Sequence, residues 1–351
     1  MNFKELLVDI CSLMSVSGWE CREREALLSL IGRYFDESYT DGVGNQVFIK
    51  RCGRENAPRI LIDTHMDEIG MFVSDIKEGG FLSVVNVGGL DTRILQACEV
   101  IVYGKKEIYG VVTSTPPHLQ KPEDSKKLKE IGELLIDTGY SKAELEEMVR
   151  IGTPVGFKPK YTELLGGCIA GKSFDDKSCA ACAIYAISVC EASELAGDVY
   201  LLLSAHEETV RMGGAGAASF AINPDYAMII DVNHGKAPDT SKVDTVAIGG
   251  GPGITLSAAT DRRLTRMTIA LAEEAGITHQ LTVAATSTGT NAPAIALVGS
   301  GVPVVDVGLP LKSMHTYNEV VSLADCEETT KLIREFITSR TLAGAFAKRE
   351  V

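Results

Sequence analysis

The amino-acid sequence predicts an α/β fold, a largely parallel mixed sheet covered by helices on both faces, with an inserted small β-barrel-like domain. Three observations predict it. First, strand-like and helical patterns alternate through residues 166–351, as expected for a parallel sheet with crossover helices. Second, residues 1–69 contain helices and strands of the same kind and complete the same domain. Third, residues 70–165 contain closely spaced short strands, which favour a small barrel or sandwich inserted into the larger domain.

The first elements are two helices and two strands, and the insertion follows them. Apolar residues recur at helical spacing in 2–15 and 19–35, and Ser17 is placed to cap the second helix. Residues 43–50 and 58–64 have the composition of strands. The insertion is expected to contain one helix, at 142–150, and short strands at 71–73, 81–85, 100–103, 108–112 and 134–136.

After residue 165 the larger domain resumes, with strands and helices in alternation. Strands are expected near 199–204, 226–231, 245–248, 280–285 and 302–307. Helical patterns occur at 176–194, 213–221, 261–276, 289–298 and from 325 to about 346. The glycine-rich segment 249–253 is expected to be a flexible loop, because it lacks the GxGxxG spacing of a dinucleotide-binding turn.

Composition and charge exclude several classes of protein. Hydrophobic residues make up 45% of the 351 residues and charged residues 23%, which excludes disordered and fibrous classes. The net charge of -13 repels nucleic-acid phosphates and anionic lipids, and we find no basic patch. The amino terminus lacks the apolar core of a secretory signal, and no stretch approaches the ~18 apolar residues of a membrane span. We therefore expect a cytoplasmic protein with no nucleic-acid or membrane partner.

The nine cysteines are expected to be free thiols. Their number is odd and their spacing has no disulfide-scaffold rhythm. Cys179 and Cys182 form a CxxC, but the small residues around them indicate a helix face packed in the core, and no second CxxC completes a zinc site.

Residues of metal-ligand types follow the apolar strands. In an open α/β sheet, ligand sites form beyond the carboxyl ends of the strands, so such side chains can converge although they are far apart in the sequence. The residues at or just after four strand ends are His65, Asp67, Glu207, Glu208, Asp231 and His315, and Asp175 opens a helix.

Each of these residues has an ordinary explanation when it is considered alone. Asp175 could be a helix cap, Glu207 and Glu208 a solvated charge pair, and a lone histidine after a strand a structural residue. Together, their imidazole and carboxylate groups suit zinc, cobalt or manganese. Two ions that share one carboxylate can activate a water molecule and polarise a carbonyl oxygen, so the pattern predicts a dinuclear metal hydrolase.

Five short motifs occur in a characteristic order. They are THMDEIG at 64–70, GKSFDDK at 171–177, HEE at 206–208, IDV at 230–232 and MHT at 314–316. In this order they resemble the motifs of the tetrahedral and glutamyl aminopeptidase family of dinuclear metallopeptidases, some relatives of which have been called endoglucanases. The resemblance extends to PPHL at 116–119 in the insertion and covers nearly the whole chain.

The resemblance implies a role for each residue. Two divalent ions, with zinc as the first choice, would be held by two ligand sets that share Asp175: His65, Asp175 and Asp231 for one ion, and Glu208, Asp175 and His315 for the other. Glu207 would be the general base and acid, and Asp67 would orient His65. The site would lie in the metallopeptidase domain formed by residues 1–69 and 166–351. The insertion, residues 70–165, would serve dimerisation, and the dimers would assemble into a homo-oligomer such as a tetrahedral dodecamer.

Three departures from the family pattern concern specificity rather than the reaction. The segment TVRMGG at 209–214 stands where relatives more often have VGLRG, and Lys312 stands where an arginine is commoner. Asn291 replaces the usual aspartate, which removes a negative charge that we expect near the site. The ligands themselves are all present. These changes therefore leave open which amino-terminal residue of a substrate is preferred.

Three other functions fit parts of the sequence. A deacylase of N-acylated amino acids could use the same metals. A glycoside hydrolase would need two carboxyl groups about 5–9.5 Å apart across the scissile bond, which the adjacent Glu207 and Glu208 do not provide. A non-catalytic assembly protein would not need a complete ligand set together with Glu207. We favour an aminopeptidase that acts on short peptides.

Overall fold

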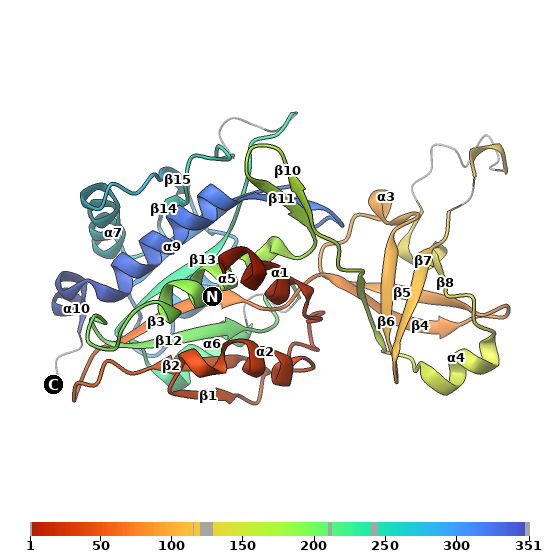
Figure 1. The fold of residues 1–351 in the computed structure, drawn as a ribbon, viewed down its shortest axis with the longest axis horizontal. Coiled ribbons are helices and arrows are strands. Elements are labelled where there is room, and N and C mark those ends of the chain that lie inside the picture. Colours follow the sequence, from red (N-terminus) through yellow and green to blue (C-terminus); the bar gives the residue numbers. More distant parts are fainter. Residues whose placement is uncertain are drawn as a thin grey trace.

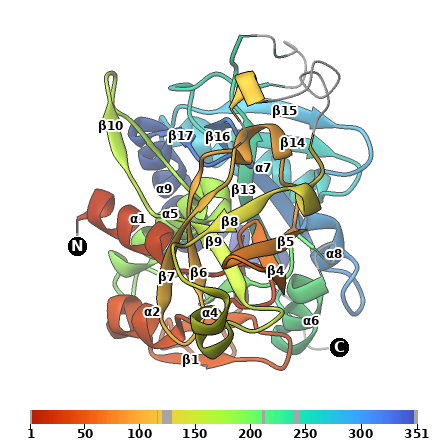
Figure 2. The same cartoon turned by 90° about the vertical axis from the view of Figure 1, so that its right-hand side faces the viewer.

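The computed structural model describes residues 2–114, 116–119, 129–209, 213–238, 240 and 245–347. These residues form two parts, a large sheet covered by helices and a β-barrel, which lie side by side in Figure 1. In Figure 2 the barrel lies in front of the sheet. No helix among these residues is both long and apolar enough to span a membrane.

The larger sheet has a parallel centre and antiparallel edges. Within the described residues it has 11 strands, and the central ones, β12, β3, β13 and β16, run parallel to one another. The main path is β1 (Glu37–Thr40), β2 (Gln46–Lys50), β12 (Asp198–Ser204), β3 (Arg59–His65), β13 (Tyr226–His234), β16 (Val304–Lys312), β17 (Glu319–Ser322), β11 (Cys168–Gly171) and β10 (Thr162–Leu164). β14 (Gly253–Ser257) branches from β16 and pairs in turn with β15 (Gln280–Ala284).

Helices cover both faces of this sheet because its central strands are apolar on both sides. Alternate side chains of a strand point to opposite faces, so Ile60 and Ile62 pack into one core and Leu61 into another. The first core lies under α1 (Phe3–Ser12), α2 (Arg24–Ile31), α5 (Phe174–Ser188), α7 (Arg262–Glu274), α9 (Leu323–Thr338) and α10 (Arg340–Phe346). The second lies under α6 (Gly213–Ile222) and α8 (Ala292–Ala296). Cys179 and Cys182 are fully buried in the first core, so the expectation of core packing is confirmed.

The inserted part is a closed antiparallel barrel with its own core. Its strand order is β4 (Gly70–Ile76), β5 (Phe81–Val87), β8 (Leu135–Asp137), β7 (Glu107–Val112), β6 (Glu99–Tyr103) and β9 (Pro154–Phe157). The first and last strands pair with each other, with Met71 opposite Val155, which closes the barrel. Two short helices, α3 (Thr92–Leu95) and α4 (Lys142–Met148), connect the strands. The predicted fold class, an α/β sheet domain with an inserted small barrel, is confirmed.

Several local predictions were wrong. Ser17 does not cap the second helix; α2 begins after Glu23, and the Ser17 hydroxyl instead lies 2.7 Å from the hydroxyl of Thr209. The segment 245–248 is not a strand but forms a single bridge at Val246, and the neighbouring strand is β14. The expected helix from 325 to about 346 is two helices, α9 and α10, which are separated at Ser339.

A buried ion cluster lies where the chain passes between the sheet and the barrel. Glu68 is 2% exposed, and its carboxylate accepts hydrogen bonds from the ammonium of Lys172 (2.5 Å) and from Ser173. The ammonium of Lys177 lies 3.1 Å from the same carboxylate and donates to the carbonyl of Leu13 (2.6 Å). Although burial alone would raise the pKa of Glu68, the two ammonium groups lower it to about 2.

Replacement of Glu68 by glutamine is expected to lower the free energy of unfolding by about 3–5 kcal/mol, because two buried ammonium groups lose their counter-ion. Since the folded pKa of about 2 lies below the ordinary 4.5, the contribution of Glu68 is complete above pH 4.5 and is lost as the pH falls toward 2. Urea unfolding at several pH values measures both effects. The control is Glu163→Gln, whose exposed pair with Lys4 is worth less than about 1 kcal/mol. Equal losses in the two variants would contradict this expectation.

Candidate metal centre

The predicted ligand residues converge at the carboxyl ends of the parallel strands. His65 is the last residue of β3, and it lies beside Ser204, the last residue of β12. Glu207 and Glu208 follow β12 closely, and Asp231 lies in the second half of β13. The two remaining residues enter from the neighbouring segments, Asp175 from the start of α5 and His315 from the loop after β16.

Two groups of side chains could each hold a metal ion, and they share one residue. One group is His65, Asp175 and Asp231; the other is Asp175, Glu208 and His315; within each group the ligand atoms lie within 4.8 Å of one another. The Oδ1 atom of Asp175 lies 3.0 Å from Nε2 of His65, and its Oδ2 atom lies 3.3 Å from Nε2 of His315. Asp175 therefore presents one oxygen to each group, as a bridging carboxylate would.

The distances between ligand atoms fit divalent ions. Bonds of about 2.0–2.1 Å in a tetrahedral arrangement place two ligand atoms about 3.3 Å apart. The Nε2 atom of His315 lies 3.2 Å from Oε1 of Glu208, and Nε2 of His65 lies 3.9 Å from Oδ1 of Asp231. The donor atoms present are thus close to the spacing that an ion in each group would require.

The buried carboxylates at the site also favour the binding of cations. Asp175 and Asp231 are 6% and 7% exposed, so their carboxylates have lost most of their contact with water. Burial raises the pKa of Asp231 well above its usual range, and repulsion from Asp176 and Asp175 adds to this effect. Burial likewise raises the pKa of Glu207 to about 7. Hydrogen bonds to Asp175 and Glu208 raise the pKa of His315 to about 11. A buried cluster with this excess of negative charge fits the binding of two dications.

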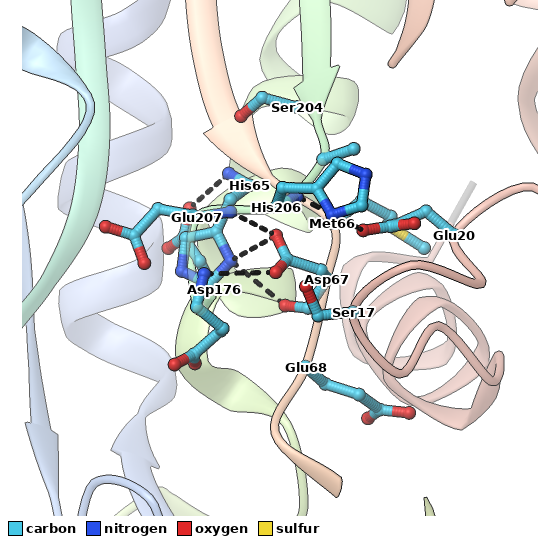
Figure 3. Close-up of polar contacts among 12 residues, drawn as sticks. Ser17, Glu20, His65, Met66, Asp67, Glu68, Asp176, Ser204, His206 and Glu207 are labelled. Carbon is cyan, nitrogen blue, oxygen red and sulfur yellow. Dashed lines mark hydrogen bonds and ion pairs between the residues drawn. The ribbon is translucent and has the colours of Figure 1, made fainter. Parts of the chain in front are cut away.

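Asp67 holds the turn that carries the glutamate pair. Its carboxylate accepts the backbone N–H groups of Glu207 (3.0 Å) and Glu208 (3.1 Å), as the dashed lines in Figure 3 show for the first. The Nδ1 atom of His65 lies 3.0 Å from the main-chain carbonyl oxygen of Asp67 and 3.6 Å from its carboxylate. Orientation of the imidazole by Asp67 stays a prediction, and the shorter of these two contacts is with the main chain.

Two further carboxylates accept backbone N–H groups of the proposed ligands. Asp176, which is fully buried, accepts from His65 (3.1 Å), and Glu319 accepts from Asp175 and His315. We did not predict either role from the sequence. Asp176 is adjacent to a predicted ligand, but only the direction of its side chain reveals the contact. Glu319 lies in none of the five sequence motifs, and the position of its side chain depends on the pairing of β17 with β11.

A cavity of about 670 Å³ opens from the two groups. Its walls away from the carboxylates come from the end of β13, from β15 and from residues 288–290. His234 lines this cavity, whereas the backbone N–H of His206 donates to the carboxylate of Glu20 (3.1 Å), as Figure 3 shows. The space is large enough for a small substrate beside the proposed ligands.

The residues that depart from the family pattern lie in different places. Asn291 does not belong to either ligand group; its amide donates to the carboxylate of Asp63 (3.0 Å) and to the hydroxyl of Ser204 (2.9 Å). An aspartate at 291 would therefore face the carboxylate of Asp63. Lys312 is the last residue of β16. In the segment 209–214, residues 210–212 lie outside the described residues.

Comparisons with known proteins agree with this geometry. A family model described as M42 glutamyl aminopeptidase matches residues 44–332. Lysyl aminopeptidase of Pyrococcus furiosus is 30% identical over 338 residues, which is 95% of this chain and 96% of that protein. The structure of a TET aminopeptidase from a marine sediment Thaumarchaeota archaeon has a TM-score of 0.90 and 28% identity, and covers 98% of both chains.

Two other solved structures bear on assembly and on the alternative functions. The TET1 peptidase of Pyrococcus horikoshii, described as assembling into a tetrahedron or a large octahedral shell, has a TM-score of 0.84 and 30% identity over 96% of this chain and 99% of that one. A Thermotoga maritima structure described as an endoglucanase has a TM-score of 0.78 and 27% identity over 99% of both chains.

Proposed function

Because this chain belongs to the M42 glutamyl aminopeptidase family, we propose that it is a metal-dependent aminopeptidase that releases single residues from the amino ends of short peptides. The observation that carries this proposal is the pair of ligand groups that share Asp175 and line one cavity. One ion would be held by His65, Asp175 and Asp231, and the other by Asp175, Glu208 and His315. Zinc suits these ligands best, and cobalt or manganese would also fit them.

Ions held by these residues would supply an activated water molecule and a Lewis acid for the carbonyl oxygen of the scissile bond. Glu207 borders the same cavity but belongs to neither ligand group, so its carboxylate is free to accept the water's proton and pass it to the leaving amine. Asp67 fixes the backbone of Glu207 and thereby the place from which this carboxylate acts.

The barrel is the part that we assign to assembly. We assign residues 70–165 to a dimerisation domain and propose a dimer-based homo-oligomer such as a tetrahedral dodecamer. The barrel carries exposed apolar side chains, since Val85, Tyr109 and Ile151 are between 46% and 64% exposed. The shells described for the Pyrococcus horikoshii TET1 peptidase are a precedent. Sedimentation velocity that finds only monomers at micromolar concentration would contradict it.

A substrate panel tests the reaction. Purified protein loaded with zinc or cobalt is expected to bind about two ions per chain and to hydrolyse aminoacyl amides and short peptides. N-acyl amino acids and a β-glucan are the other substrates in the panel, because a deacylase and a glycoside hydrolase are the alternative functions. Turnover of N-acyl amino acids without turnover of aminoacyl amides would support the deacylase instead. Glucan hydrolysis that survives a chelator would overturn the assignment to a metallopeptidase.

A further inference from the structure

Glu319 lies where two segments that carry proposed ligands leave the sheet. It is the first residue of β17 and pairs with Gly171, the last residue of β11. From Gly171 the chain continues over a few residues to Asp175. On the other side of β17, β16 ends at Lys312 and leads into the loop that carries His315. One side chain is thus within reach of both segments.

The carboxylate of Glu319 joins these segments through their main chains. Its Oε2 atom accepts the backbone N–H of Asp175 (3.1 Å), and its Oε1 atom accepts the backbone N–H of His315 (2.9 Å). The side chain is 2% exposed, so water does not compete for these hydrogen bonds. The two residues held in this way are two of the three members of one ligand group.

We call the two hydrogen bonds of Glu319 to the N–H groups of Asp175 and His315 the clamp. The backbone near both of these residues is held in a conformation that it would not adopt by itself. His315 has a φ of 59°, Ser313 a φ of 58° and Ser173 a φ of 59°, all in the left-handed region that disfavours residues other than glycine. Such conformations persist only where surrounding contacts enforce them. The hydrogen bond to the N–H of His315 is one contact that does so.

We propose that Glu319 is a positioning residue that sets the separation of Asp175 and His315, and so determines how tightly the ion between them is bound. This inference rests on the proposed function, because it assigns that ion to this ligand group. Glu319 touches neither ion nor substrate in this proposal; it acts through the two peptide groups.

The test compares two carboxylates of similar setting. Asp325 is 1% exposed and also accepts two backbone N–H groups, those of Gly249 (2.7 Å) and Gly251 (2.8 Å), neither of which borders the cavity. Glu319→Gln and Asp325→Asn each replace one acceptor oxygen by an NH₂ group, so one N–H loses its partner in either variant. Glu319→Asp keeps the charge but is one methylene shorter. The probe is cobalt(II) chloride, titrated into chelator-treated protein and followed by visible absorption.

We expect Glu319→Gln and Glu319→Asp to weaken cobalt binding by about 10–100-fold at the site formed by Asp175, Glu208 and His315, and Asp325→Asn to bind both ions as the native protein does. Wild-type affinity in Glu319→Gln, or an equal loss in Asp325→Asn, would overturn the inference. Wild-type cobalt affinity in Glu319→Asp together with weakened binding in Glu319→Gln would also overturn the inference. The charge of residue 319, rather than the length of its side chain, would then be responsible for tight binding.

A second measurement needs no metal. In chelator-treated protein, hydrogen exchange at the amides of Asp175 and His315 is expected to be slow in the native chain, and exchange at one of the two amides is expected to be at least about tenfold faster in Glu319→Gln. Unchanged exchange would overturn the clamp. Native protein that binds fewer than two cobalt ions but shows this exchange pattern would refute the dinuclear function and leave the clamp intact, so the two failures are distinguishable.

Discussion

Replacement of Glu207 by glutamine is expected to lower kcat for aminoacyl amides by about 10²–10⁴-fold while both metal ions stay bound. Glutamine keeps the shape of the side chain but cannot accept a proton, and general base catalysis contributes a factor of this size. The metal content should persist because Glu207 lies outside both ligand groups. Steady-state kinetics and elemental analysis of the same preparation measure the two quantities together.

The adjacent residue provides the matched control. Glu208→Gln is the same substitution one position along the same turn, and both backbone N–H groups are held by Asp67. Because Glu208 belongs to a ligand group with Asp175 and His315, its variant is expected to lose affinity for one ion, and added metal should restore part of the activity. Added metal should not restore Glu207→Gln. A Glu207→Gln variant with native kcat would remove this residue from the proposed mechanism.

Replacement of Asp175 by asparagine is expected to weaken the binding of both ions and to lower kcat/KM by at least about 10³-fold. Asp175 is the member common to the two groups, with one oxygen directed to each. Asparagine offers one carbonyl oxygen and a donor amide, so it cannot serve both ions. Loss of the metals removes several kcal/mol of transition-state stabilisation, which corresponds to a factor of this size.

Metal content again decides the interpretation. Asp176→Asn is the control, since Asp176 is the next residue and is also buried, but it accepts the backbone N–H of His65 and belongs to neither group. We expect Asp176→Asn to retain two ions, with a smaller loss of affinity. If Asp175→Asn kept two tightly bound ions and Asp176→Asn did not, the assignment of the bridging carboxylate would be wrong.

The central strands of the sheet could be predicted from sequence because burial on both faces leaves long apolar runs. β3, β12, β13 and β16 are of this kind, and their existence also predicts that residues at their ends meet. Two edge strands, β1 and β10, were missed for the opposite reason. β1 is half-exposed and β10 fully exposed, so their residues carry no apolar alternation, and only pairing with a neighbour makes them strands.

The candidate site likewise contains residues that could be predicted from the sequence and a residue that could not. His65, Asp231 and Glu208 could be found because each lies in or just after the carboxyl-terminal part of an apolar strand, and the structure brings their side chains together with Asp175 and His315. Their roles as ligands stay a prediction. Glu319 could not be found, because its contacts depend on the register between β17 and β11, which are far apart in the sequence.

The closure of the barrel by β4 and β9 has a consequence for how the chain folds. β3 must pair with β12 across residues 66–197, and the entropy cost of closing a loop grows with the logarithm of its length. Met71 and Val155 face each other within the barrel, so once the barrel has formed, its entry and exit are already neighbours. A folded barrel therefore converts most of this long loop into a rigid body with adjacent ends. The pairing of β3 with β12 then depends only on the remaining connections, residues 66–69 and 158–197, so the insertion adds little to the loop that must close in the sheet that carries the metal centre.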